Sequence, residues 1–275
     1  MNPFLHVLDR AIATFNDLPV WKHNCRVWGQ RMMSPTFERW LYLRMHRLGF
    51  MGRDEWTFLE RYLRPGMHIL DVGSNLGLYS ILMAQRAGPG GRVICFEPDP
   101  GLFAALQENR RLNGVTCIET HNLALGSAPA KLALHRSVLN SGDNHLGRSE
   151  SDLFRRTVTI EVVSLDAFRP NLALDLVKID VQGWELEALR GMRRTLEANP
   201  AVAVYFEFSP LGYTRVDSTY QDLIGFFREM GFRIFDPLAG TELDDARLAR
   251  LAASLGRTGY TNLIASRAFT LPPKP

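Results

Sequence analysis

Cysteine is scarce in this chain of 275 residues, which contains only Cys25, Cys95 and Cys117. Three widely spaced cysteines without a C-x-x-C spacing exclude a disulfide-stapled miniprotein and favour a reduced, cytoplasmic protein. No apolar run approaches the ~18–20 residues that a membrane-spanning helix needs, so no membrane span is expected. The first residues, MNPFLHVLDR, include an acid and lack the apolar core of a signal peptide.

The chain also has little excess charge of either sign. Its formal net charge of +3 is too small to indicate a nucleic-acid partner. Lysine is rare, since only four of the 32 basic residues are lysines. We interpret the arginine excess as compositional, with pairing of guanidinium groups to an anionic ligand as the alternative. Hydrophobic residues at 46% and charged residues at 22% are typical of a globular protein with a sizeable core.

Residues 1–64 have the apolar spacing of helices and are expected to form a helical N-terminal cap. Four of the five tryptophans lie here, namely Trp21, Trp28, Trp40 and Trp56. Packing of the cap onto the rest of the protein is the simplest explanation for them. An aromatic lid over an apolar or sugar-like substrate and a dimer contact are the alternatives. A Pro-Gly break at 64–66 then ends the helical pattern.

Residues 65–275 alternate between apolar strands and amphipathic helices, which is typical of a parallel, doubly wound sheet. A segment at 131–165 interrupts this alternation with two further strands and a polar loop. We therefore expect one α/β domain with a Rossmann-like, mostly parallel, seven-stranded sheet and helices on both faces. The expected strands are 67–73, 92–98, 116–125, 175–180, 201–208, 232–236 and 260–267, and one expected helix is 184–196.

The segment Asp71-Val-Gly73-Ser-Asn-Leu-Gly77 directly follows the first strand of this domain. Gly73 allows a sharp turn out of the strand, and Gly77 lets the next helix start close to the sheet. A ligand can then lie against bare backbone and the N–H groups at the helix start. Because ligands bind beyond the carboxyl ends of strands in open α/β sheets, this glycine loop predicts a binding site.

The ligand is not expected to be a dinucleotide. A dinucleotide-binding loop has a G-x-G-x-x-G pattern that makes room for a pyrophosphate, whereas this loop has only G-x-x-x-G after an acid. Asp71 suits a cationic group such as an amino-acid ammonium. Glu97 ends the second strand, 24 residues beyond Gly73, where an acid accepts hydrogen bonds from ribose hydroxyls. S-adenosylmethionine combines these features, and a nicotinamide-dependent oxidoreductase is the alternative.

Five segments resemble, in order and spacing, the FkbM family of S-adenosylmethionine-dependent methyltransferases. They are ILDVGSNLGLYS, VICFEPDP, NRRLNG, LALG and VKIDVQGWELEALRGM. The resemblance covers roughly residues 53–210, with looser similarity to the end. It implies a class I methyltransferase fold and O-methylation of a hydroxyl on a sugar, a polyketide or another secondary metabolite or glycan.

The resemblance also implies a set of cofactor-binding residues. The glycine loop would hold the methionine part, Glu97 the ribose, and the two residues just past the third strand the adenine. Ser74 stands where family members often have alanine, which is a small change. Gln182 stands where they often have glutamate, which removes one candidate carboxylate. The full set is Asp71, Gly73, Ser74, Asn75, Gly77, Glu97, Asn122 and Leu123.

Two carboxylates are expected beside the reacting centre. Asp180 ends the fourth strand and Glu207 ends the fifth, and neighbouring strands would bring both to the same rim. Methyl transfer to a hydroxyl needs the oxygen in line with the sulfonium and a place for its proton. Asp180 is the first candidate for general base or acceptor orienter and Glu207 the second, with a purely structural acid as the alternative for each.

Lys178 and His145 complete the candidates for catalysis. Lys178 lies on the same strand face as Asp180, two residues before it, and is expected to pair with Asp180 or a neighbouring acid, with direct catalysis as the alternative. His145 lies in the polar insert and is either a further base or a flexible surface histidine. A metal bound by His145, Asp180 and Glu207 is conceivable, but the chain has no H-x-x-x-H pair, so no metal is expected.

The sequence therefore predicts an O-methyltransferase that uses S-adenosylmethionine and acts on a small-molecule or glycan acceptor. An Asn-Pro-Pro-aromatic run, expected after the fourth strand in enzymes that methylate nucleobase amines, is missing, which argues against DNA or RNA as the substrate. A homodimer is one option for its assembly. A catalytically inactive subunit that keeps the cofactor pocket is the alternative from another class.

Overall fold

The computed structural model of the protein describes residues 7–8, 11, 23–137, 140–148, 155–256 and 259–271. Trp21 and the end of the polar insert therefore lie outside the described residues. Every helix in these ranges is too short or too polar to cross a membrane.

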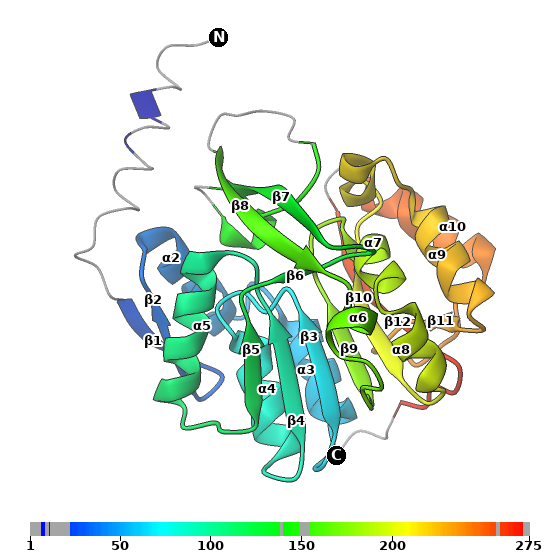
Figure 1. Cartoon of the computed structure of the whole chain (residues 1–275), viewed down its shortest axis with the longest axis horizontal. Coiled ribbons are helices and arrows are strands. Elements are labelled where there is room, and N and C mark those ends of the chain that lie inside the picture. Colours follow the sequence, from blue (N-terminus) through cyan, green and yellow to red (C-terminus); the bar gives the residue numbers. More distant parts are fainter. Residues whose placement is uncertain are drawn as a thin grey trace.

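A seven-stranded sheet forms the centre of the molecule (Figure 1). Its strand order is β11-β12-β10-β9-β3-β4-β5, and only β12 runs antiparallel to its neighbours. The predicted fold class, a mostly parallel seven-stranded α/β sheet, is confirmed. The strands are β3 His68–Val72, β4 Arg92–Phe96, β5 Ile118–His121, β9 Leu176–Ile179, β10 Ala203–Phe208, β11 Arg233–Phe235 and β12 Thr261–Ser266.

Strand β3 lies where the strand order reverses. The chain adds β4 and β5 on one side of β3 and β9 and β10 on the other. Loops that leave the strands at such a point diverge and open a crevice at the carboxyl ends of the strands. The glycine loop leaves the sheet at this point.

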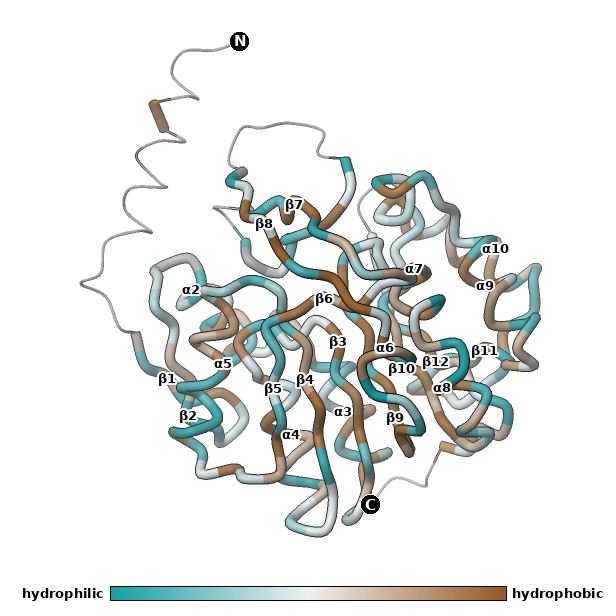
Figure 2. The backbone as a smooth tube through the Cα atoms, in the orientation of Figure 1, coloured by the Kyte–Doolittle hydropathy of each residue, from teal (hydrophilic) through white to brown (hydrophobic). Residues whose placement is uncertain are grey.

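Helices cover both faces of the sheet, so its central strands are buried on both sides and read as nearly continuous apolar runs. Figure 2 shows these strands as the most hydrophobic part of the fold. One buried cluster lies under α3 Arg53–Tyr62, α4 Leu78–Ala87 and α5 Pro100–Leu112. The other lies under α6 Leu165–Phe168, α7 Glu185–Arg190, α8 Arg193–Ala198, α9 Tyr220–Glu229 and α10 Asp245–Leu255.

The N-terminal region contains a β-hairpin that the helical spacing did not predict. Strands β1 His23–Val27 and β2 Gln30–Ser34 pair antiparallel, and both turn residues are left-handed, Trp28 at φ 49° and Gly29 at φ 83°. Helix α2 Phe37–Arg47 and helix α3 follow as expected. The prediction of an all-helical cap is therefore wrong at the hairpin, because HNCRV and QRMMS lack the clean alternation that indicates a strand.

The cap shares its core with the sheet. Val27, Leu43 and Leu59 belong to the same buried cluster as the side chains on one face of β3 and β4, namely Ile69, Val93 and Cys95. The ring of Phe58 stacks on Tyr205 of β10, with centroids 4.6 Å apart. This packing accords with the simplest explanation of the cap's tryptophan content.

A second, three-stranded sheet lies across the carboxyl ends of the large one (Figure 1). Its order is β6-β8-β7, from β6 Ala124–Leu125, β7 Ala130–Ser137 and β8 Arg155–Val163. Strand β6 follows β5 after two residues, so the interruption at 131–165 folds back over the crevice. Two 3₁₀ helices, η1 Ser141–Asp143 and η2 Gly212–Val216, lie in the connecting loops.

The helix expected over 184–196 is broken into α7 and α8. Gly191 lies at the break, and a Cβ atom there would overlap the carbonyl oxygen of Gly126. Tertiary packing against the loop after β6 therefore overrides the continuous helical spacing of the sequence.

Candidate active site

The glycine loop runs between the ends of β4 and β9. Gly73 has φ 84°, and a Cβ atom there would overlap the carbonyl oxygen of Asp180. The N–H groups of Gly73 and Ser74 donate to the carbonyl oxygen of Phe96 at 2.9 and 3.1 Å. Gly77, at φ 83°, is the N-cap of α4 and packs against Leu106. Both glycines are thus required by backbone conformation and close approach.

Glu97 follows β4 with its carboxyl group buried beside this loop. Its Oε2 accepts a hydrogen bond from the N–H of Asn75 at 2.7 Å, and its Oε1 from the N–H of Asp99 at 2.9 Å. Burial raises the pKa of Glu97 to about 8, although both backbone donors oppose this shift. Each oxygen keeps lone-pair capacity for a further donor, such as a ligand hydroxyl.

A cavity lies between the glycine loop, Glu97 and the small sheet. Its empty volume is about 910 Å³, which includes the open space at its mouth. Apolar and aromatic walls come from Phe96, Leu125, Leu146 and Trp184. Six of the residues expected to bind the cofactor line this cavity, namely Asp71, Gly73, Ser74, Asn75, Glu97 and Leu123.

Gly77 and Asn122 are not among the lining residues. The side-chain amide of Asn122 donates to the carbonyl oxygens of Glu97 at 2.8 Å and Pro98 at 3.0 Å. Asn122 therefore fixes the segment that carries Glu97, while its neighbour Leu123 faces the cavity.

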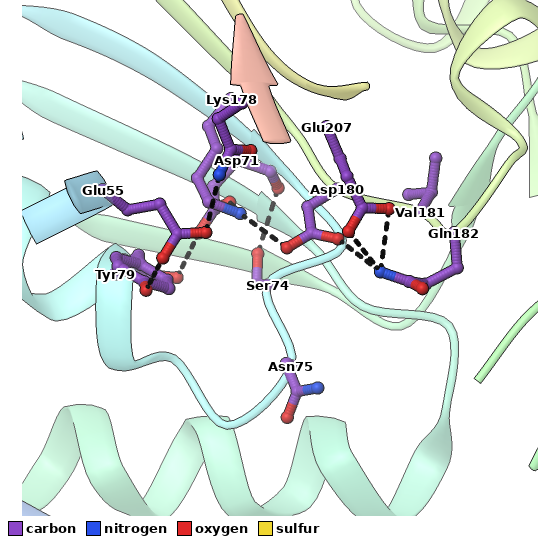
Figure 3. A network of polar contacts seen from close by, with 12 residues as sticks. Glu55, Asp71, Ser74, Asn75, Tyr79, Lys178, Asp180, Val181, Gln182 and Glu207 are labelled. Atoms are coloured by element: carbon purple, nitrogen blue, oxygen red, sulfur yellow. Dashed lines mark hydrogen bonds and ion pairs between the residues drawn. The ribbon is translucent and has the colours of Figure 1, made fainter. Parts of the chain in front are cut away.

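Lys178 is buried in β9 among acidic side chains (Figure 3). Its Nζ lies 3.8 Å from Asp71 Oδ1 and 3.6 Å from Asp180 Oδ2, so the predicted ion pair with Asp180 or a neighbouring acid is confirmed. Burial lowers the pKa of Lys178, but the charges of Asp180 and Asp71 outweigh burial and leave it raised. The amine is thus held in its charged form.

Asp180 and Glu207 lie side by side at the rim, joined by Gln182 (Figure 3). The parallel register pairs Ile179 with Phe206, which places the next residue of each strand opposite the other. Gln182 Nε2 lies 3.0 Å from Asp180 Oδ1 and 3.0 Å from both carboxyl oxygens of Glu207. Burial, with the nearby charges of Asp180 and Glu185, raises the pKa of Glu207 well above its ordinary value.

A second cavity opens on the other side of these acids, with an empty volume of about 1230 Å³, mouth included. Both cavities are lined by Tyr42, Tyr79, Asp180 and Gln182, so they meet at the acids. Glu207 lines only the second cavity. The two cavities thus adjoin at Asp180, and Glu207 lies beside it on the side of the second cavity.

Residues 71–234, more than half of the chain, match the methyltransferase FkbM domain. The chain belongs to the FkbM methyltransferase family. The family resemblance found in the sequence is thereby confirmed, and with it S-adenosylmethionine as the cofactor.

Three relatives show how far the similarity of this FkbM-family chain extends. It is 32% identical over 144 residues to Methyltransferase 1 of Beauveria bassiana, covering 45% of this chain and 57% of the relative. It is 31% identical over 130 residues to the hexuronic acid methyltransferase AglP of Haloferax volcanii, covering 46% and 51%. It is 29% identical over 225 residues to the 31-O-demethyl-FK506 methyltransferase FkbM of Streptomyces tacrolimicus, covering 69% and 83%. The chain thus spans little more than half the length of the first two.

His145 is buried in this FkbM-family chain, with 2% of its surface exposed, so its interpretation as a flexible surface histidine is wrong. Its backbone pairs with His135 of β7, and its ring Nδ1 lies 3.0 Å from the carbonyl oxygen of Asp143. It lines the first cavity, whereas Glu207 lines the second. Among the residues that the structure describes, no group of three or more histidine, cysteine or acidic side chains is arranged to hold a metal ion.

The cap supplies site residues of the FkbM-family chain that the sequence did not single out. Glu55 of α3 accepts hydrogen bonds from Tyr79 Oη at 2.6 Å and from Asn262 Nδ2 at 2.9 Å. His46 of α2 lines the second cavity, and burial lowers its pKa to about 4, so its ring is neutral. One signal was available for Glu55, which precedes Phe58 and Leu59 by three and four residues on the buried face of its helix.

Proposed function

We propose that the protein is an S-adenosylmethionine-dependent O-methyltransferase that acts on a hydroxyl of a sugar, polyketide or other secondary metabolite or glycan. The observation that carries this proposal is the junction of two cavities at Asp180, with Glu207 beside it in the second cavity. One cavity has the glycine loop and a buried acid for the cofactor. The other has room for an acceptor beside two carboxyl groups.

The residues of the first cavity fit the cofactor. Glu97 retains acceptor capacity toward ribose hydroxyls, and Gly73, Ser74 and Asn75 of the glycine loop line the same cavity. Asp71 Oδ1 is buried without a hydrogen-bond partner among the described residues, so it can receive a donor from the methionine part. Leu123 and Trp184 offer apolar contact to the adenine. The bound cofactor supplies an electrophilic methyl group on a sulfonium.

The two carboxyl groups have different tasks in this proposal. Asp180 lies at the rim with its Oδ2 3.6 Å from the Lys178 Nζ, and this place suits it to orient the acceptor hydroxyl. Glu207 is more deeply buried and its pKa is raised, so its ionised form is the stronger base and accepts the proton that the hydroxyl loses. This ordering reverses the sequence-based preference for Asp180 as the base.

The names of two relatives support a hydroxyl acceptor without identifying it. The Sinorhizobium fredii relative NoeI is a 2-O-methyltransferase, and FkbM acts on 31-O-demethyl-FK506, whereas the name of AglP, a hexuronic acid methyltransferase, specifies only a sugar acid. A nicotinamide-dependent oxidoreductase is disfavoured, because the loop lacks the additional glycine that a pyrophosphate requires. An inactive cofactor-binding subunit is disfavoured by the carboxyl pair in the acceptor cavity.

The test is transfer of tritium from methyl-labelled S-adenosylmethionine to small molecules and glycans extracted from the organism that encodes the protein. We expect label in an acceptor fraction with the native chain and a fall of at least about 100-fold with Glu207→Gln. Release of label by mild reduction of an ester, rather than retention as an ether, would argue against a hydroxyl acceptor. Tight cofactor binding without transfer to any fraction would favour the inactive subunit.

A further inference from the structure

The loop after β9 holds Gln182 in a conformation that non-glycine residues rarely adopt, with φ 55°. The buried carboxyl group of Glu185 fixes the backbone on both sides of it. Glu185 Oε1 accepts from the N–H of Val181, and Oε2 from the N–H of Gly183, both at 3.0 Å. A left-handed residue persists only where its surroundings determine it, so this loop is built to aim one side chain.

The backbone on either side of the loop leaves it little room to move. A Cβ atom at Gly73 would overlap the carbonyl oxygen of Asp180, and one at Gly183 would overlap that of Gly212. The glycine loop and η2 therefore pack against the loop after β9 from two sides. From this loop the side chain of Gln182 extends toward Asp180 and Glu207, as Figure 3 shows.

An amide nitrogen suits this place chemically. It carries two N–H donors, and here one nitrogen serves the carboxyl groups of both Asp180 and Glu207 at 3.0 Å. Two neighbouring carboxylates repel each other unless a donor or a proton lies between them. We propose that Gln182 is a positioning residue, which holds Asp180 and Glu207 as a hydrogen-bonded pair facing the acceptor cavity and favours the ionised form of Glu207.

Most other groups around Glu207 raise its pKa, whereas the hydrogen bond from Gln182 lowers it. Asp180, Glu185 on α7 and Glu55 on α3 contribute negative charge, and Tyr213 of η2 donates to the backbone oxygen of Glu207. Lys178 of β9 is the nearby cation, and Tyr260 lines the same cavity. Gln182 counters the effect of these acids, because it is neutral and donates a hydrogen bond to Glu207. A glutamate at position 182 would instead add a third carboxyl group beside the pair.

The test compares the native full-length chain with Gln182→Met, which keeps the side-chain length and removes both donors, and with Gln182→Glu. The measurement is the free energy of unfolding from pH 4 to pH 9. Because the folded-state pKa of Glu207 is raised, the folded chain holds its proton longer, and this group lowers stability as pH rises from about 4.5 through the folded pKa. In Gln182→Met, the fall in the free energy of unfolding should extend to a pH about 1 unit higher than in the native chain. In Gln182→Glu it should extend at least as high.

Glu207→Gln removes one of the two carboxyl groups that Gln182 contacts, so adding Gln182→Met to it should change the shape of the pH profile less than Gln182→Met does in the native chain. Gln85→Met on the exposed face of α4 is the matched control and should follow the native profile. A Gln182→Met profile that differs from the native one only by a constant offset would overturn the proposal. If Gln182→Met does not fold, Gln182→Leu, which also lacks both donors and adds no titrating group, carries the same comparison. The catalytic meaning of the pair rests on the proposed function, but this readout needs no acceptor and no methyl transfer, so the two can fail separately.

Discussion

At the scale of single residues, Glu97 combines burial with a proposed task, binding of the ribose, that needs its charge. Among the described residues, the N–H groups of Asn75 and Asp99 donate to its carboxyl group, and burial raises its pKa to about 8. Hydroxyl donors of a bound ribose favour the ionised form. Binding below pH 8 must therefore release the proton of Glu97.

This linkage predicts that the affinity for S-adenosylhomocysteine rises with pH, by up to about tenfold per unit, and levels off above pH 8. Glu97→Gln should bind more weakly, by about 1–3 kcal/mol at pH 8, and should lose this part of the pH dependence. Titration calorimetry between pH 6 and pH 9 measures both. An equally steep rise in the variant would assign the proton to another group.

Asp180 is the second residue whose role can be separated from folding. Its side chain is 32% exposed but pairs with the buried Lys178, so Asp180→Asn should lower the free energy of unfolding, and its activity is compared only after circular dichroism shows that the variant is folded. We expect methyl transfer to fall by about 10–1000-fold while S-adenosylhomocysteine affinity changes by less than about threefold. Loss of cofactor affinity in parallel with turnover would place Asp180 in the cofactor site instead.

The sequence was most informative where a residue's role follows from its place on a strand. Asp180 and Glu207 were predicted together because each ends a strand and the two strands are neighbours. Asn122 was expected beside the adenine, but its amide instead holds the Glu97 segment. Glu55 and His46 were missed, because which cap residues reach the site depends on tertiary packing that no local motif records.

At the scale of elements, the glycine loop depends on the close approach of β3 and β9. Gly73→Ala would place a methyl group on the carbonyl oxygen of Asp180, whereas Gly66→Ala has the same left-handed φ, 85° against 84°, and open space. Gly66→Ala should therefore cost only the backbone strain, about 1 kcal/mol. Gly73→Ala should cost at least 2 kcal/mol more and abolish binding of S-adenosylhomocysteine.

Denaturant unfolding and calorimetry on the two variants test this difference. Equal destabilisation by both would show that the contact between the loops is not tight. Normal cofactor affinity in Gly73→Ala would remove the loop from the site.

Element boundaries show where sequence patterns stop being sufficient. The alternation of strand and helix predicts the seven strands, because buried strands are long apolar runs between glycine-containing turns. The pattern fails at the β1–β2 hairpin, whose strands are polar, and at Gly191, where contact with Gly126 divides a helix. In both places partners distant in sequence determine the structure.

At the scale of the whole molecule, the cap and the sheet are built around one core. Phe58 is fully buried against Tyr205, while Phe50 in the turn before α3 is 77% exposed. Phe58→Ala should lower the free energy of unfolding by about 3–5 kcal/mol, and Phe50→Ala should change it by less than about 0.5 kcal/mol.

The shared core also predicts one cooperative transition. Tryptophan fluorescence, dominated by the cap, and far-UV circular dichroism should report the same denaturant midpoint. A fluorescence transition at clearly lower denaturant would show that the cap unfolds as an independent unit.

The central claim is that the first cavity binds S-adenosylmethionine rather than a dinucleotide, and that the acids at its rim serve methyl transfer. Calorimetric titration of the native chain with S-adenosylhomocysteine and, separately, with NAD tests it most directly. We predict saturable 1:1 binding of S-adenosylhomocysteine and no heat of binding from NAD. Binding of NAD in the absence of S-adenosylhomocysteine binding would contradict the account.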